Sequence, residues 1–496
     1  MKIRPSVFVA GLTLAALVSV GLAAENKDYQ KDLRAAQSQQ RSKRYRECLK
    51  ACDQMLEAYK ETWQAKELTW LKVETLVLDS QYEATLKALA DLAKAYSEDK
   101  ELQAAAALRT GDVQRLLKKP EDAVAVYRKL AEAAAKDQPE QAAEALLRAG
   151  ETLAADLKKP DQALALYREV ESKFAALDAK RAAEALRRIA TAHEAEGKDF
   201  LKAAAAYQAL TEKHAAVFDD GTLAGLCGKA VECFLKAEKP AEATAAARKA
   251  EESLKSVGLK ASFGIRLGDL LLEQKRPAEA RAEYQRIICS YPLEQGACQN
   301  AQAKIVEAYR AESQWADALG AARILYDAAG DESSIRNAAQ VVAQAFLAAD
   351  GSLGRANDFL AYQRFGPDGP DGKPKTEDDI AANRLAEVKY PTPSAAANQQ
   401  FQAAVKAQPD GYEGYRAKGF LYVYWGKPKE GAGQFRLAFK AATLNQVPAA
   451  SQELVLVGMK AFTASFRGLD RIFEYLSYGP KGKSGKENLP DPFAGL

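Results

Sequence analysis

The sequence predicts an all-α solenoid of antiparallel helix pairs, about nine to ten units of 36–40 residues each. In the stretch Leu108–Tyr127 a helical half, a Lys-Lys-Pro turn and a second helical half follow one another, and this arrangement returns along the chain. The small residue that opens each second half recurs at intervals of 36–40 residues. Alanine is abundant, which fits because it is the best helix former and allows close helix contacts.

The small residue that sets the period defines one face of each second helix. Its positions are Cys48, Ala84, Ala123, Ala163, Ala203, Ala243, Ala280, Ala318 and Ala356. One turn later stand Cys52, Ala88, Tyr127, Tyr167, Tyr207, Ala247, Tyr284, Ala322 and Leu360. Residues four apart meet on one helix face, so each pair lets a neighbouring helix approach closely.

This pattern resembles the tetratricopeptide repeat, and more closely its slightly long bacterial form found in periplasmic helper proteins. The resemblance covers about residues 40–362, with a further degenerate unit near 411–440. The early aromatic residue of family units is mostly absent, and several units exceed the usual length of about 34 residues. The resemblance implies a right-handed superhelical solenoid that holds a peptide or a helix in its concave groove.

Residues 1–23 are typical of a secretory signal peptide. Lys2 and Arg4 precede the apolar run 7–22, and small residues follow at the expected cleavage site. A single membrane anchor is the alternative, although the run is shorter than the roughly 20 apolar residues that a spanning helix needs. We expect export to the periplasm or cell surface of a bacterium, with a mature chain that begins near Ala24.

The remaining chain divides by pattern. We expect N-terminal capping and degenerate repeats at 24–106, the solenoid at 107–362, a Gly/Pro/Asp-rich loop at 363–390, a C-terminal helical repeat region at 391–478 and a disordered tail at 479–496. A terminal repeat is atypical because one of its faces meets water. The aromatic run 420–425 is expected to plug the end of the solenoid, or otherwise to form an exposed partner site.

Composition excludes several classes of function. The formal net charge is +3, and loss of Lys2 and Arg4 leaves about +1, which gives no electrostatic case for nucleic acid. No later stretch approaches eighteen uninterrupted apolar residues, so we expect no membrane span in the mature chain. The chain has two histidines, no Gly-rich phosphate loop and no His-Glu-x-x-His motif, so we expect neither catalysis nor a cofactor, calcium aside.

Polar residues on the first helices are candidates for partner binding. The candidates are Asp112, Arg115, Glu151, Arg187, Glu194 and Asp269. We expect them to face the concave side of the superhelix, where arrays of this kind hold a peptide or a helix. A solvated helix face is the alternative for each of them.

The six cysteines predict at most one disulfide. Cys289 and Cys298 flank the turn between two units, and a bridge there would join adjacent helices if their Cα atoms approach within about 7 Å. Cys48 and Cys52 lie one turn apart at core-facing positions, which favours packing. A metal site on cysteines is not expected, because no Cys-x-x-Cys occurs.

A Gly/Pro/Asp-rich segment follows the repeats and is a candidate calcium site. Clustered carboxylates with glycines at turn positions suit Ca²⁺, which takes six to eight oxygen ligands. The candidate ligands are Asp368, Asp371, Asp378 and Asp379. Residues 365–373 align without gaps with 478–486, where Lys481 and Ser484 replace the first two aspartates. A purely structural turn is therefore the alternative.

Together these patterns predict a non-enzymatic exported scaffold or adaptor that binds other envelope proteins or peptides through the concave groove. A calcium-binding surface or matrix protein is one alternative. An accessory subunit of an envelope enzyme complex is another.

Overall fold

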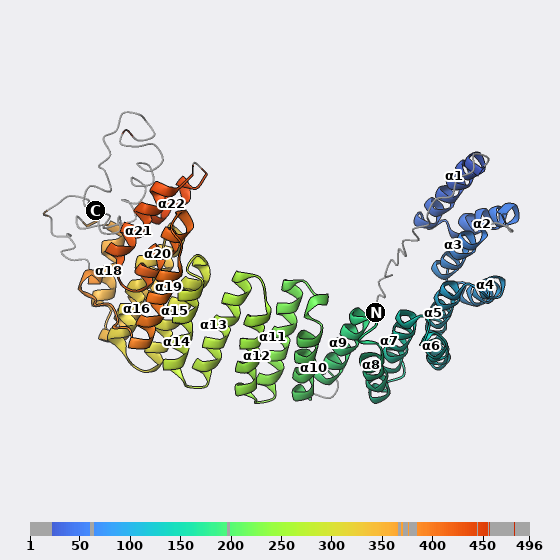
Figure 1. Ribbon diagram of the computed structural model, residues 1–496, viewed down its shortest axis with the longest axis horizontal. Coiled ribbons are helices and arrows are strands. Elements are labelled where there is room, and N and C mark those ends of the chain that lie inside the picture. Colours follow the sequence, from blue (N-terminus) through green and yellow to red (C-terminus); the bar gives the residue numbers. More distant parts are fainter. Residues whose placement is uncertain are drawn as a thin grey trace. The chain divides into compact units, whose positions relative to one another are not determined.

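The computed structural model shows the predicted all-α solenoid of helix pairs (Figure 1). It describes residues 22–59, 64–195, 199–365, 369–370, 375, 384–443, 445–454, 456 and 481. All regular secondary structure in these residues is helical. The predicted signal peptide lies outside them except for its last two residues.

Ten helix pairs follow one another in this described part of the chain, each with a first and a second helix. The first helices are α1 (Leu22–Arg41), α3 (Gln64–Leu78), α5 (Lys100–Leu116), α7 (Pro139–Ala155), α9 (Ala179–Ala195), α11 (Asp220–Lys236), α13 (Val257–Glu273), α15 (Gln295–Ala311), α17 (Glu332–Asp350) and α20 (Tyr412–Tyr424). The second helices are α2 (Tyr45–Tyr59), α4 (Tyr82–Ala95), α6 (Pro120–Ala134), α8 (Pro160–Phe174), α10 (Phe200–Lys213), α12 (Pro240–Ser253), α14 (Pro277–Ser290), α16 (Trp315–Ala328), α18 (Gly354–Phe365) and α21 (Pro428–Ala441). The remaining helices are α19 (Ala395–Ala407), α22 (Val447–Leu454) and the short 3₁₀ turns η1 (Ala215–Val217) and η2 (Arg384–Glu387).

One backbone conformation closes the turn inside most pairs. In the α5–α6 turn, Lys118 adopts a left-handed conformation with φ of 60°, and the amide of Lys119 donates to the carbonyl of Gln114 at 2.9 Å. Pro120 then occupies the first position of α6, where its fixed φ suits a helix and its missing N–H is not needed. The equivalent left-handed residues are Lys43, Ser80, Lys158, Glu238, Lys275, Ser313 and Gly426.

Glycine and tyrosine set the distance between the helices of a pair. A Cβ atom at Gly111 would lie 2.3 Å from the Tyr127 ring, and that ring is fully buried. The same contact recurs in the pairs Gly150–Tyr167, Gly268–Tyr284 and Gly419–Phe435. A side chain at these positions would push the helices apart, which explains why glycine interrupts helices rich in alanine.

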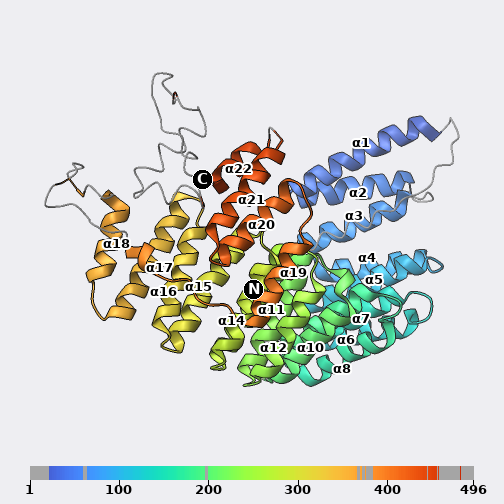
Figure 2. The ribbon, with the colours of Figure 1, turned by 60° about the vertical axis from the view of Figure 1, so that its left-hand side comes forward.

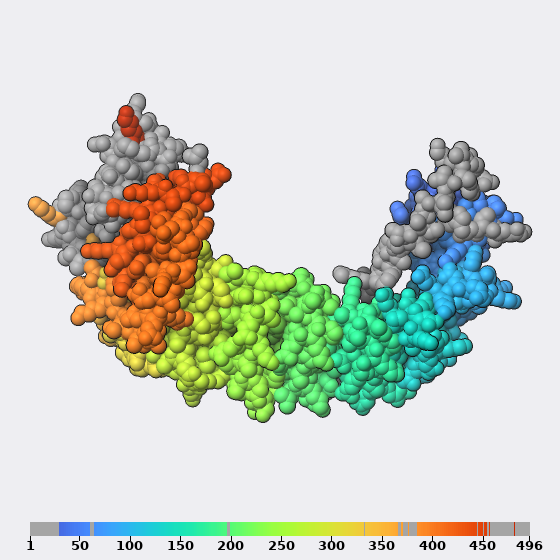
Figure 3. Space-filling model, viewed as in Figure 1, coloured from blue at the N-terminus to red at the C-terminus, as the bar shows by residue number. Residues whose placement is uncertain are grey.

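The chain forms two compact units, Met1–Ala192 and His193–Leu496, and their boundary falls within α9. In the first unit, the helices from α1 to α8 pack against their neighbours in chain order. In the second unit the helices from α10 to α18 do the same, and the segment that follows folds back so that α19 and α20 pack against α14 and α16. Figures 2 and 3 show α19–α21 in orange beside the yellow helices of this stack.

The aromatic run 420–425 belongs to this returning segment, and its predicted place was wrong. It does not plug the end of the solenoid, because α17 and α18 continue the stack beyond α16. Leu421 and Trp425 instead pack with Phe401 and Cys289, on the side of α14. Among the described residues, no helix is long and apolar enough to cross a membrane.

Candidate interaction surface on the first helices

A half-exposed polar stripe runs along the first helices of the first unit. In α7 it consists of Glu144, Arg148 and Glu151, whose spacing of four and three residues places them on one helix face. The alanines and leucines between them are buried. We call the full set the ion-pair belt; its members are Glu74, Arg109, Asp112, Arg115, Glu144, Arg148, Glu151, Arg181, Glu184 and Arg188.

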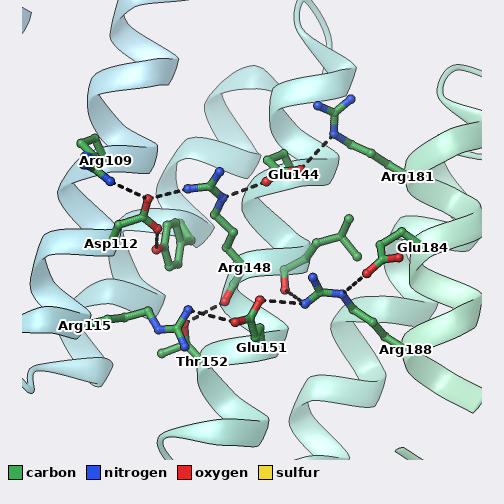
Figure 4. A network of polar contacts seen from close by, with 12 residues as sticks. Arg109, Asp112, Arg115, Glu144, Arg148, Glu151, Thr152, Arg181, Glu184 and Arg188 are labelled. Carbon is green, nitrogen blue, oxygen red and sulfur yellow. Dashed lines mark hydrogen bonds and ion pairs between the residues drawn. The ribbon is translucent and has the colours of Figure 1, made fainter. Parts of the chain in front are cut away.

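Arg148 is the centre of one row of the belt (Figure 4). Its Nη1 atom donates to Asp112 Oδ2 at 2.6 Å, and its Nε atom donates to Glu144 Oε1 at 2.8 Å. The other oxygen of Glu144 accepts from Arg181 Nε at 3.2 Å. The hydroxyl of Tyr127 donates to the second oxygen of Asp112 at 2.6 Å. The row therefore joins α5, α6, α7 and α9.

Glu151 is the centre of a second, neighbouring row (Figure 4). One of its oxygens accepts from Arg115 Nη1 at 3.3 Å and the other from Arg188 Nη1 at 3.1 Å. Each arginine has a further carboxylate partner: Arg115 Nε donates to Asp156 and Arg188 Nε donates to Glu184, both at 2.8 Å. Every charged group in this row thus has an opposite charge beside it.

The number of arginines beside a carboxylate decides its pKa. Burial alone would raise the pKa of Glu144, but the charges and hydrogen bonds of Arg148 and Arg181 outweigh burial and lower it. Glu74 has only Arg109 as a partner, with 2.5 Å between Arg109 Nη2 and Glu74 Oε2. Burial therefore dominates there, and the pKa of Glu74 is raised.

The belt bonds have the period of the repeat. Partners on successive first helices are separated by 35–37 residues in sequence. Each bond therefore connects one helix pair to the next helix pair. Because the contacts are partly buried and Arg115, Arg148 and Arg188 each bridge two carboxylates, they fix the stacking geometry as well as neutralising charge.

The second unit has a sparser version of the belt. Glu194 accepts from the Tyr207 hydroxyl at 3.1 Å and lies 3.4 Å from Lys229 Nζ. The corresponding residues around α13 are Asp269, Tyr284 and Lys304, with distances of 2.7 and 3.5 Å. Lysines here take the place that arginines hold in the first unit.

The structure places the six predicted partner-binding residues as follows: Asp112, Arg115 and Glu151 in the belt, Arg187 half-exposed beside Glu184, and Glu194 and Asp269 in the second unit. The prediction that they bind a partner stays a prediction. Sequence reasoning missed Glu144, Arg148, Arg181 and Arg188. Opposite charges one repeat period apart on successive first helices were the signal that would have found them.

The predicted calcium ligands Asp368, Asp371, Asp378 and Asp379 lie outside the described residues. Within the part of the chain that the structure describes, no group of three or more His, Cys, Asp or Glu side chains could hold a metal ion.

The predicted disulfide is not present in the structure, in which Cys289 and Cys298 are buried free thiols. The Sγ atom of Cys298 donates to the carbonyl of Tyr291 at 3.3 Å, whereas Cys289 packs against Phe401 and Trp425. The two thiols are near enough for Cys289 to contribute to the raised pKa of Cys298, after burial, but no bond joins them. Burial raises the pKa of Cys289 to about 12, which keeps this thiol protonated and unreactive.

The sequence model of the family described as "Tetratricopeptide repeat" matches residues 144–176. These residues cover most of α7 and all of α8, and they include the centres of both belt rows. The chain therefore contains at least one repeat that is similar to the tetratricopeptide repeat. Repeats of this family build scaffolds for protein–protein interaction. No curated protein sequence matches this repeat protein.

Solved structures of other proteins are similar to this chain at low identity. A tetratricopeptide repeat protein from Parabacteroides merdae has 11% identity and a TM-score of 0.30, covering 55% of this chain and 99% of its own. Naa15/Naa10 bound to HypK-THB has 13% identity and a TM-score of 0.28, with coverages of 86% and 66%. The apo form of the quorum sensor NprR from B. thuringiensis has 15% identity and a TM-score of 0.26, with coverages of 67% and 96%.

Proposed function

We propose that this protein is a non-enzymatic, exported scaffold or adaptor that binds other proteins of the cell envelope through its first helices. The repeat architecture supports this proposal, because a stack of helix pairs offers an extended surface to a partner. The signal-peptide pattern of residues 1–23 supports export.

The ion-pair belt is the observation that carries the proposed binding surface. Its side chains are partly exposed: 23% of Arg148 and 44% of Glu151 is accessible to solvent. Bonds between successive helix pairs hold these side chains in place, so little side-chain freedom is lost when a partner binds. A surface with this preorganisation suits recognition of an extended or helical segment.

Charge balance in the belt determines what kind of partner it suits. Arginines and carboxylates alternate along each row, so the belt attracts neither a strongly acidic nor a strongly basic partner. A partner with alternating charges, or with backbone amides and carbonyls placed along the rows, fits this pattern better. Salt should then weaken binding only moderately, because few charges remain unpaired.

Site-specific photo-crosslinking tests the binding surface. A photoreactive residue at Thr191, exposed on α9 one turn beyond Arg187, should capture a partner from the envelope fraction. The matched control is Ala165, exposed on the second helix α8. Capture at position 191 and not at 165 supports the proposal. Capture at neither position, or at 165 alone, contradicts it.

Export has a separate test. Cells that make the full chain are fractionated, and the amino terminus of the protein in each fraction is sequenced. A chain that begins near Ala24 in the periplasmic or surface fraction supports export. An intact residue 1 in the cytosol contradicts it, and an intact residue 1 in the membrane fraction identifies an anchor.

A further inference from the structure

One second helix differs from its neighbours at a single position. Two residues after the small residue that opens each second helix, five successive helices carry an exposed alanine. These residues are Ala125, Ala165, Ala205, Ala245 and Ala282. In α16 the equivalent residue is Gly320, and it is buried. The outer face of α16 is therefore covered where the others meet solvent.

The cover is a segment of the same chain, residues 386–393, most of which has no regular secondary structure. A Cβ atom at Gly320 would lie 2.5 Å from the carbonyl oxygen of Lys389 and 2.9 Å from Cδ of Pro391. Alanine cannot occupy this position while the segment is bound. The absence of a side chain at 320 is what allows the segment's backbone to touch the helix.

Two charged residues on the same face of α16 bind the segment. Arg323 Nη1 donates to the carbonyl of Val388, and its guanidinium lies 4.3 Å from the centre of the Tyr390 ring. The Tyr390 hydroxyl donates to Asp327 Oδ2 at 2.8 Å. With Gly320, these residues follow at spacings of three and four, so they form one stripe along the helix.

Two prolines complete the contact. Pro391 and Pro393 border a cavity of about 30 Å³, whose other lining residues include Ile288, Ile305, Ile324 and Trp425. Tyr424 also lines this cavity, and its buried hydroxyl has no hydrogen-bond partner among the residues that the structure describes. A cavity of this size holds one or two water molecules. It is too small for a further ligand. Pro391 and Pro393 therefore already occupy most of the apolar space beside α16.

The far side of the segment rests on the returning helices. Gly426, in the α20–α21 turn, has φ of 68°, and a Cβ atom there would lie 2.8 Å from the Tyr390 ring. The segment is thus held between α16 and this turn. Its recognised features are a carbonyl, a tyrosine and two prolines in extended backbone, which are the features that peptide-binding domains read.

We propose that the outer face of α16 is a recognition site for an extended Tyr-Pro-x-Pro segment. In this chain residues 390–393 fill the site themselves, and another protein that presents such a segment binds by replacing them. The site lies on second helices, apart from the ion-pair belt. The proposal extends the proposed protein-binding function to a second surface and does not depend on the belt.

The covalent tether sets how strongly an outside segment must compete. A segment on the same chain acts at an effective concentration on the order of millimolar. A free segment of equal intrinsic affinity therefore binds the intact chain much more weakly than a chain whose own segment is impaired. Weakening the internal segment should expose the site to outside ligand.

The test uses a labelled peptide with the sequence of residues 384–394 and fluorescence anisotropy on the full chain. Tyr390→Ala removes the ring and the hydroxyl from the internal segment and leaves α16 intact. We expect this variant to bind the peptide at least tenfold more tightly than the unmodified chain. A peptide with alanine in place of its tyrosine should not bind.

A second variant keeps the test decisive. Adding Gly320→Ala to Tyr390→Ala places a Cβ atom against the peptide backbone, and we expect binding to be lost. Gly225→Ala is the control, because a Cβ atom there meets nothing within 4 Å. Equal binding with and without the Gly320→Ala change contradicts the site. So does absence of binding to the Tyr390→Ala chain when its far-UV circular dichroism is unchanged. Neither result bears on capture at position 191.

Discussion

The first helices of the two units share one design and differ in its charged residues. In both units a carboxylate accepts from a buried tyrosine of the same pair, as at Asp112 and Asp269. In the first unit the partner from the next helix is an arginine, such as Arg148 at 2.6 Å. In the second unit it is a lysine, such as Lys304 at 3.5 Å.

This difference separates two structural roles: contacts that hold the two helices of a pair together, and contacts that join one pair to the next. The glycine–tyrosine contact and the tyrosine–carboxylate bond act inside a helix pair, and both occur in each of the two compact units. The arginine forks connect one pair to the next, and arginine suits this because its planar guanidinium binds two carboxylates at once. Lysine can neutralise a carboxylate, but its single ammonium group constrains the stacking of one helix pair on the next less strictly.

The largest expected effect concerns the glycine–tyrosine contact, which both compact units contain. Gly111→Ala and Gly268→Ala each place a Cβ atom 2.3 Å from a fully buried tyrosine ring. We expect each to lower the free energy of unfolding by about 3 kcal/mol, because the buried ring has little room to move aside. Urea unfolding followed by far-UV circular dichroism measures this.

The control for both glycine variants is Gly225→Ala in α11, where the added Cβ atom meets no neighbour. It should raise the free energy of unfolding by about 0.5–1 kcal/mol, since alanine is the better helix former. Similar losses in all three variants would contradict the packing role of Gly111 and Gly268.

The second effect is the pH dependence of stability at two glutamates, Glu453 and Glu144, which should have opposite signs. Burial raises the pKa of Glu453 to about 7, although Arg416 opposes this shift. Its contribution to stability is therefore full below the ordinary value of about 4.5 and is lost as pH rises through about 7. For Glu144, whose pKa is lowered, the contribution is present above about 4.5 and is lost as the solution becomes more acidic.

Unfolding of Glu453→Gln and Glu144→Gln at pH 4, 6 and 8 checks these signs. Relative to the unmodified chain, Glu453→Gln should gain about 2–3 kcal/mol between pH 4 and pH 8. Glu144→Gln should change in the other direction, with its loss of stability smallest at the lowest pH. Parallel pH profiles for the two variants would show that one arginine serves as well as two.

The repeat architecture followed from the sequence because its signals are local. A left-handed turn residue, a proline at the first position of the second helix and a glycine opposite a tyrosine each recur in several helix pairs and act within one pair. The Lys-Lys-Pro turn predicted within Leu108–Tyr127 coincides with the start of α6 at Pro120. Each such signal repeats, so errors at one unit are corrected by the others.

The ion-pair belt and the covered outer face of α16 could not be predicted from the sequence, because they depend on contacts between different helix pairs. Arg148 looks like an ordinary charged helix residue until Asp112 on the preceding first helix is placed beside it. The returning segment is harder still, since Tyr390 lies 63 residues from Asp327 and beyond the repeats. Only the glycine at 320, where five other second helices carry alanine, marked that face in the sequence.

A third effect tests arginine against lysine directly. Arg148→Ala should cost about 2 kcal/mol, because its guanidinium is mostly buried and contacts two carboxylates. Lys229→Ala should cost no more than about 0.5 kcal/mol, because that side chain is 46% exposed. Urea unfolding at low and high salt measures both. Equal losses would remove the distinction between the two units.

The smallest effect concerns the turns that both units share. Lys118 and Lys275 hold φ near 60°, a conformation that glycine adopts without steric cost. Glycine also gains more freedom in the unfolded chain, which offsets part of that benefit. We expect Lys118→Gly and Lys275→Gly each to raise the free energy of unfolding by about 0.5 kcal/mol. Lys119→Gly, where φ is −115°, should lower it by a similar amount, because only the unfolded-state term remains. Thermal unfolding of the three variants measures these differences, and a gain at position 119 would show that the left-handed conformation carries no strain.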